Sequence, residues 1–167
     1  MTLAAGVAVA AGCGTSAPGG VASTSESTAV STTAVVSTRE VEVDTGDLVD
    51  PAIRTITVDG TDYLVAFADQ PEARARGLMG VEDLGDLDGM LFDLEVERDA
   101  NFVMRDTLIP LDIVFFAADG TGRTMLTMEP CRAEPCPTYP SGAPVRFALE
   151  VPAGTTELSA DSVLVVP

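Results

Sequence analysis

The sequence predicts a mainly β fold, an all-β sandwich or barrel with one short helix, and three observations support this prediction. From about Ile53 onward, apolar and polar residues alternate with the side-chain period of a β-strand. The apolar segments are short, and turn residues separate them at close spacing, as in sandwiches and barrels. A single segment carries the start and stop signals of a helix. We expect strands at IRTITV, YLVAF, GMLFDL, NFVMR, LDIVFF, RTMLTM, VRFALEV and SVLVV.

Two Asp-Gly dipeptides predict hairpins between neighbouring strands. Asp59-Gly60 separates the first two apolar segments, and Asp119-Gly120 follows LDIVFF. Such dipeptides favour tight hairpin turns because both residues tolerate a positive φ. We therefore expect the strands on either side of each dipeptide to pair.

The predicted helix follows the second strand. Asp69 with Glu72 three residues later resembles a capping box, and Pro71 suits the first helical turn. Gly77 is typical of a helix C-terminus. We expect a short helix that includes EARARG.

The acidic run FDLEVERD predicts a strand with one solvated face. Alternation would place Phe92, Leu94 and Val96 toward the core and the intervening carboxylates toward solvent. The carboxylates around this run also match part of the spacing of an EF-hand loop, but Leu84 stands at its first position and no helix precedes it. We therefore expect no metal site and no cofactor.

The N-terminus predicts export and a lipid anchor. Leu3 to Ala11 is too short to span a bilayer but suits the apolar region of a secretion signal. AAGC resembles a bacterial lipobox that ends in a lipidated Cys13, although Ala10 replaces the usual Leu and no basic residues precede the run. The alternative is an Ala-rich N-terminus with an incidental buried cysteine. The lipobox interpretation predicts a lipoprotein on the outer face of the cell membrane.

The segment after Cys13 predicts a disordered tether. It is rich in Ser, Thr, Gly and Ala, and such a segment buries too little apolar surface to offset its ordering entropy. We expect a signal remnant at 1–13, a tether at 14–50 and the β domain at 51–167.

The two remaining cysteines predict a structural disulfide. Cys131 and Cys136 lie close in sequence within EPCRAEPCP, and an oxidising compartment would favour their pairing. A zinc site would need further soft ligands, and a redox site more often has CxxC spacing, so both alternatives are weaker.

Charge and composition exclude several functions. The formal net charge is −17, which makes binding to a nucleic-acid phosphate backbone unfavourable. All nine basic residues are Arg, and this usage suits a GC-rich genome. His is absent, so the chain holds no Ser-His-Asp unit and no His-containing zinc site.

The segment from about Thr55 to Val166 resembles the DUF192 (UPF0127) family, whose function is unassigned. The resemblance rests on DQPEARARGLMG, GMLF, FVMRDTLIPLDIVFFAADG, TMEPC with PCPTYP, and FALEVPAG, in this order. It implies a compact β-sandwich of jelly-roll-like character. Together with the lipobox-like N-terminus, we expect this domain in a bacterial, actinobacterial-type lipoprotein. The chain departs from the family's Phe-Trp-Met-Lys-Asn-Thr stretch, since Val103 replaces Trp, Arg105 replaces Lys and Asp106 replaces Asn.

The resemblance directs attention to a set of polar residues near these stretches. Arg side chains beside a strand end can form a small pocket for an anionic or hydroxylated ligand. The competing interpretation is that Arg76 and Arg105 pair with Asp106 or Asp112 and only hold the helix on the sheet. The candidate ligand-binding residues are Arg76, Arg105, Asp106, Thr107 and Asp112.

Three functions fit these observations. We favour a lipid-anchored binding or interaction module at the cell envelope. We expect it to be a monomer that binds a small molecule or an envelope protein. A hydrolase of envelope or extracellular glycans that uses two carboxylates such as Asp106 and Asp112 is the alternative. A structural role in the envelope is the third. We expect no catalytic residues under the favoured interpretation.

Overall fold

A computed structural model describes residues 42–154 and 157–167 of the chain. The predicted signal segment, the lipidation of Cys13 and the tether up to residue 41 lie outside the described residues. No helix of the described part is long and apolar enough to cross a membrane.

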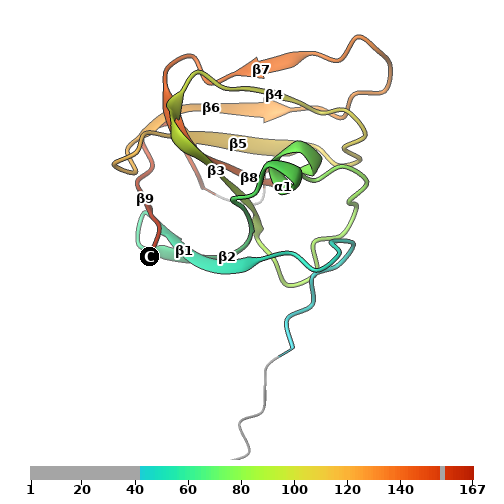
Figure 1. Cartoon of the computed structure of the whole chain (residues 1–167), viewed down its shortest axis with the longest axis horizontal. Helices are drawn as coiled ribbons and strands as arrows, with labels where there is room; N and C mark the ends of the chain where they lie inside the picture. The colour runs from blue at the N-terminus through green and yellow to red at the C-terminus, as the bar shows by residue number, and fades with distance from the viewer. Residues whose placement is uncertain (1–41, 155–156) are drawn as a thin grey trace, which may run out of the picture. The chain divides into compact units, whose positions relative to one another are not determined.

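The described residues form a mainly β domain with one short helix, which confirms the predicted fold class (Figure 1). The elements are β1 (Ile53–Val58), β2 (Thr61–Ala68), α1 (Pro71–Arg76), β3 (Gly89–Arg98), β4 (Asn101–Val103), β5 (Leu111–Phe116), β6 (Gly122–Met128), β7 (Thr138–Pro140), β8 (Val145–Pro152) and β9 (Leu164–Val165). All eight predicted strand segments contain a strand, and β7 is an additional short one.

Seven strands form one curled sheet in the order β6-β5-β8-β3-β2-β1-β9. Neighbouring strands run antiparallel except β2 and β3, which are parallel and are connected through α1. A parallel pair needs such a crossover because a tight turn cannot return the chain to the same end of the sheet. The short strands β4 and β7 pair separately and lie beside β5 and β6 (Figure 1).

Both faces of the sheet carry buried apolar side chains. Along β5, Ile113 and Phe115 belong to one core cluster, whereas Val114 and Phe116 belong to the other. Each of these side chains is fully buried and stabilises the fold by about 1.5–3 kcal/mol. The first cluster lies on the face that α1 and β4 cover, and it therefore forms the base of the site described below.

The first predicted hairpin forms as expected, and the second is modified. Asp59 and Gly60 both have positive φ, 52° and 83°, as a type I′ turn requires. In the β5–β6 hairpin only Gly120 has a positive φ, and the register shifts between Phe115 and Phe116. The shift shows that this connection is a bulged hairpin.

The predicted helix start is wrong by one residue. Gln70 is the N-cap and its side chain makes no capping hydrogen bond, so Asp69 and Glu72 do not form the expected capping box. Pro71 begins the helix and needs no N–H partner there. Gly77 ends it with a φ of 51° and donates its N–H to the carbonyl of Ala73 at 2.9 Å.

The alternation predicted along β3 fails at Val96, which is 64% exposed. Phe92 and Leu94 are buried as expected. Glu95 has a φ of 68°, and the pairing with β8 is irregular between Asp93 and Arg98. A bulge of this kind shifts the following side chains to a different face, and this explains the exposed valine.

The residues just before β1 also pack on the domain, although the sequence analysis assigned them to the tether. Leu48 is buried and Val43 contacts the first core cluster. The Asp47 carboxylate accepts hydrogen bonds from the backbone N–H groups of Glu82 and Asp83 at 2.9 and 2.8 Å, and these bonds lower its pKa. The folded part therefore includes residues 43–48.

Candidate functional site

A pocket of about 510 Å³ lies where α1, the end of β3, β4, the β4–β5 loop and β8 meet. This volume is within the range of sites for small organic ligands. Leu78, Phe92, Leu94 and Phe102 form part of its apolar wall. The rings of Phe92 and Phe102 meet edge to face with centroids 5.1 Å apart. This aromatic contact fixes β4 against the sheet and keeps that wall in place.

Arginines are concentrated at this pocket. Four of the nine arginines of the chain line it, although the protein carries a net charge of −17. The four are Arg74, Arg76, Arg98 and Arg105. They come from α1, the end of β3 and the β4–β5 loop, and only the fold brings them together.

Arg74 fixes α1 to the sheet. Its guanidinium donates to the backbone carbonyls of Asp69 at 2.6 Å and Asp93 at 3.0 Å, and it pairs with Glu95 at 2.6 Å. Its side chain is only 15% exposed, so these bonds are shielded from water. Because its donors are engaged, Arg74 supports the wall of the pocket.

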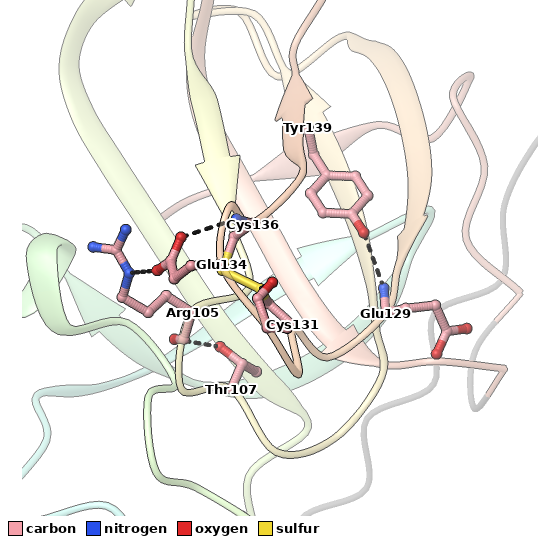
Figure 2. Close-up of a disulfide and its surroundings, with 8 residues drawn as sticks. Arg105, Thr107, Glu129, Cys131, Glu134, Cys136 and Tyr139 are labelled. Carbon is pink, nitrogen blue, oxygen red and sulfur yellow. Dashed lines mark hydrogen bonds and ion pairs between the residues drawn. A yellow bond between two sulfur atoms is a disulfide. The ribbon is translucent and has the colours of Figure 1, made fainter.

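Arg105 is linked to the disulfide loop (Figure 2). Its Nε donates to Oε1 of Glu134 at 2.7 Å, and Oε2 of Glu134 accepts the backbone N–H of Cys136 at 3.0 Å. The hydrogen bond and charge of Glu134 raise the pKa of Arg105, and the hydrogen bond from Arg105 lowers the pKa of Glu134. Both side chains are exposed, so water screens this pair.

The disulfide predicted between Cys131 and Cys136 is confirmed, with a Cα–Cα distance of 5.5 Å (Figure 2). Cys131 also forms a parallel β-bridge with Arg105, and its N–H donates to the carbonyl of Met104 at 3.2 Å. The disulfide loop is therefore held against the loop that presents Arg105 to the pocket.

Arg76 and Arg98 have no side-chain hydrogen bond or ion pair to any residue within 42–154 and 157–167. Both side chains are exposed and both line the pocket. A guanidinium has five N–H donors in a planar fork that matches carboxylate and phosphate oxygens. These two residues therefore have unused donors available to a ligand.

Glu150 is the buried carboxyl of the pocket. It lies on β8 between Met90 of β3 and Ile113 of β5, and it is 5% exposed. Its side chain makes no hydrogen bond or ion pair with another described residue. Burial alone raises its pKa from 4.5 to about 8. Near neutral pH it is therefore mainly an uncharged carboxylic acid, with one O–H to donate.

The structure separates the predicted site residues into two groups. Arg76, Arg105 and Thr107 line the pocket, whereas Asp106 and Asp112 do not. The Asp112 carboxylate accepts hydrogen bonds from the Thr127 hydroxyl at 2.6 Å and the Gly154 N–H at 2.9 Å. It is buried and faces the opposite side of β5 from Ile113. Asp112 is therefore satisfied within the fold.

Asp106 acts through its backbone. Its φ is 53°, which Asp tolerates, and its carbonyl accepts the N–H of Gly80 at 2.8 Å. This bond joins the loop after α1 to the β4–β5 loop. Neither Asp106 nor Asp112 forms the ion pair with Arg76 or Arg105 that the competing interpretation expected, because the ion-pair partner of Arg105 is Glu134.

Sequence reasoning missed Arg98 and Glu150. Arg98 lies in the acidic run that we interpreted as a solvated strand face, and the bulge in β3 redirects that end of the strand. Glu150 did have a signal. It is a lone carboxyl inside FALEV, a strand with apolar residues at almost every position, and such a residue either has a partner or faces a cavity.

The carboxylates whose spacing resembled an EF-hand loop, which include Asp86 and Asp88, do not lie together in the fold. Within the described residues, no group of three or more His, Cys, Asp or Glu side chains is placed to hold a metal ion. Asp88 instead accepts the N–H of Leu64 at 2.7 Å, and Asp86 accepts the N–H of Asp44 at 2.9 Å. These carboxylates organise the loops around them.

Comparison with known proteins gives a family and a fold. The family model DUF192, described as an uncharacterized ACR, matches residues 54–162. A protein from Sinorhizobium meliloti 1021, provisionally named a transcription regulator, has 31% identity and a TM-score of 0.63, and the match covers 71% of this chain and 96% of that one. A protein of unknown function from Novosphingobium aromaticivorans DSM 12444 has 25% identity and a TM-score of 0.64, with 76% and 94% covered. No curated protein matches the chain. The chain belongs to the DUF192 family.

Proposed function

We propose that this domain is a binding module of the cell envelope whose pocket takes a small organic anion. The observation that carries the proposal is the concentration of arginines at one pocket in a strongly acidic protein. Two of these arginines, Arg76 and Arg98, have no side-chain partner among the residues that the structure describes. The ligand is an oxyanion, a carboxylate or a phosphate, on a body of about monosaccharide size.

Charge supports this choice of ligand. The net charge of −17 repels an anion in general, whereas the arginines gathered at this pocket attract it there. Hydrogen bonds from a guanidinium to an oxyanion are worth about 1.5–3 kcal/mol each, more than bonds between neutral groups. The apolar wall around Phe92 and Phe102 then contacts the body of the ligand.

The envelope location rests on the sequence. The lipobox-like AAGC at Cys13 and the Ser/Thr-rich segment after it support an anchored domain on a tether. The disulfide agrees with an oxidising compartment. A ligand that reaches the pocket there is a solute or fragment present outside the cytoplasm.

The hydrolase alternative is less favoured by the geometry. Neither Asp106 nor Asp112 lines the pocket described above, and the carboxylate of Asp112 already accepts two hydrogen bonds. A glycosidase needs two carboxyl groups across one substrate bond.

The transcription-regulator name of the similar Sinorhizobium protein also gains no support here, because a net charge of −17 opposes nucleic-acid binding.

Thermal unfolding of the purified full chain tests the proposal. Glucuronate supplies a carboxylate, glucose 6-phosphate a phosphate, and glucose is the matched neutral sugar. We expect one or both anions to raise the melting temperature by several degrees at saturation and glucose to leave it unchanged. Sodium chloride at equal ionic strength controls for a general salt effect.

Matched variants show where the anion binds. The double variant Arg76→Gln/Arg98→Gln should lose the melting-temperature shift, whereas Arg123→Gln, an exposed β6 residue outside the pocket, should retain it. The proposal is wrong if neither anion raises the melting temperature, if glucose does so equally, or if the double variant retains the full effect.

A further inference from the structure

Glu150 has no structural role that the described residues reveal. An apolar side chain would suit its place on β8, because Ala148, Met90 and Ile113 around it belong to the first core cluster. A buried polar group without a hydrogen-bond partner costs about 1–3 kcal/mol. The carboxyl is nevertheless present, and it lines the same pocket as the arginines.

The charged groups around Glu150 do not neutralise it. Arg74 and Arg76 face the pocket from α1, Arg98 and Asp99 from the end of β3, and Arg105 from the β4–β5 loop. The β5 residues on the same face of the sheet are Leu111, Ile113 and Phe115, none of which titrates. Burial raises the pKa of Glu150. Within the described residues, no hydrogen bond or ion pair joins its carboxyl to any of these guanidinium groups, so we treat the two as separate parts of one pocket.

A ligand that occupies both parts needs two kinds of polar group. Its anion binds the arginines, and a second oxygen reaches the carboxyl. A carboxylic acid offers one O–H donor and one carbonyl acceptor, so it pairs with a hydroxyl or a carbonyl oxygen. An aliphatic acid has no such oxygen and would leave the carboxyl unpaired.

We propose that Glu150 hydrogen-bonds an oxygen of the ligand beyond its anionic group, so that the pocket selects hydroxylated or carbonyl-bearing acids, such as sugar acids, over plain aliphatic acids. The inference rests on the proposed anion site and adds the class of ligand that this site takes. Glu150 is then a specificity-determining residue. Sites that hydrogen-bond a ligand hydroxyl reject ligands without that hydroxyl, because the buried polar group of the site is then left unpaired. We expect Glu150 to discriminate between ligands in the same way.

The same contact makes binding depend on pH. Loss of the Glu150 proton removes the donor and places a negative charge in a pocket that holds an anion. Affinity should therefore be constant at lower pH and fall above about pH 8, by up to about tenfold per pH unit. A sugar carboxylate is already ionised throughout this range.

The test compares glucuronate with cyclohexanecarboxylate, which has a similar ring and carboxylate but no hydroxyl groups. Isothermal titration calorimetry on the full chain gives both dissociation constants near pH 6.5 and near pH 9. We expect the wild type to bind glucuronate at least about tenfold more tightly, which is the range that one hydrogen bond supplies. Binding of glucuronate should weaken at the higher pH.

Two variants separate the hydrogen bond from the charge. Glu150→Gln retains a donor and a similar volume, so it should keep the preference for glucuronate and lose the pH dependence. Glu150→Met removes the donor and should bind both acids with affinities within about twofold, while still binding through the arginines. The melting temperature of each variant verifies that it is folded.

The outcomes distinguish this inference from the proposed function. If Glu150→Met keeps the preference, or Glu150→Gln keeps the pH dependence, while Arg76→Gln/Arg98→Gln weakens both acids, the role of Glu150 is wrong and the anion site stands. If neither acid binds the wild type, the inference is wrong, and the anion site is wrong with it unless glucose 6-phosphate binds. If the arginine variant binds both acids normally, the anion site and the inference fail together.

Discussion

Arg105 and Glu134 form an ion pair of 2.7 Å that joins the rim of the pocket to the disulfide loop. The Glu134 carboxylate also accepts a hydrogen bond from the backbone N–H of Cys136. The disulfide loop therefore holds this carboxylate in place beside the Arg105 guanidinium. The ion pair lowers the positive potential that Arg105 contributes to the pocket. If the pocket binds an anion as proposed, we expect this ion pair to limit the affinity.

Removal of this carboxylate should strengthen anion binding. In Glu134→Gln, the Arg105 guanidinium loses its negative partner, and we expect the dissociation constant of glucuronate to fall about two- to fivefold at low salt. The melting temperature should change little, because both side chains are exposed. Calorimetry at low and high salt measures the effect, which should shrink as salt increases. An unchanged or weaker affinity at low salt would show that Arg105 does not act on the bound anion.

The disulfide should contribute to stability as well as to the position of Glu134. The double variant Cys131→Ser/Cys136→Ser should lower the free energy of unfolding by about 2 kcal/mol, the value expected for a short closed loop. Urea denaturation measures this change. The wild type in a thiol reductant provides the matched comparison and should show the same loss. A variant as stable as the wild type would mean that other contacts hold this loop.

Glu150 should make stability depend on pH in an unusual direction. Its pKa is about 8 in the folded protein against an ordinary value of 4.5, so the folded state retains a proton that the unfolded state releases. Between these two pKa values, the free energy of unfolding falls as pH rises, by up to about 1.4 kcal/mol per pH unit. Below the lower value and above the higher one, Glu150 causes no further change with pH.

The measurement is the difference in the free energy of unfolding between the wild type and Glu150→Gln across about pH 5 to 8, which cancels the titration of the other groups. We expect the wild type to lose stability relative to the variant as pH increases. Glu150→Met should be more stable than the wild type near neutral pH, because it removes an unpaired buried polar group. A constant difference across this range would mean that Glu150 is ionised in the folded protein.

Arg74 and Arg76 lie two residues apart on α1 and should behave differently. Arg74→Met removes hydrogen bonds to the carbonyls of Asp69 and Asp93, and we expect a loss of about 1–3 kcal/mol in the free energy of unfolding. Arg76→Met removes an exposed side chain without a described partner and should alter stability by no more than about 0.5 kcal/mol. Urea denaturation of both variants tests this contrast. Equal losses would contradict the separate roles assigned to the two arginines.

The strands were predictable because their signals are local. Alternation and Asp-Gly turns identified every strand longer than three residues. β7 has only three residues and ends in a proline, so its sequence carries almost no period. Val96 was assigned to the wrong face because a bulge depends on how β3 pairs with β8, and this pairing is a tertiary feature.

The pocket was only partly predictable because its residues converge from distant segments. Arg76 and Arg105 were found through the family resemblance, and the pocket does bring them together. Asp112 does not line this pocket, and the sequence could not show this because it does not reveal which face of β5 meets Gly154 and Thr127. Arg98 could be recognised only once β3 and α1 were placed around one cavity. The sequence marks Glu150 as a lone carboxyl in an apolar strand, but only the fold shows that it meets the arginines.

The dissociation constant of glucuronate for the wild type and for Arg76→Gln/Arg98→Gln, measured by calorimetry on the full chain near pH 7, tests the anion site most directly. Each lost charge-assisted hydrogen bond should weaken binding about tenfold or more, so we expect a loss of about 100-fold in the double variant. Arg123→Gln removes one positive charge, where the double variant removes two, and Arg123 does not line the pocket. This variant should bind glucuronate with an affinity within about twofold of the wild type. Equal binding by the wild type and the double variant would contradict the account.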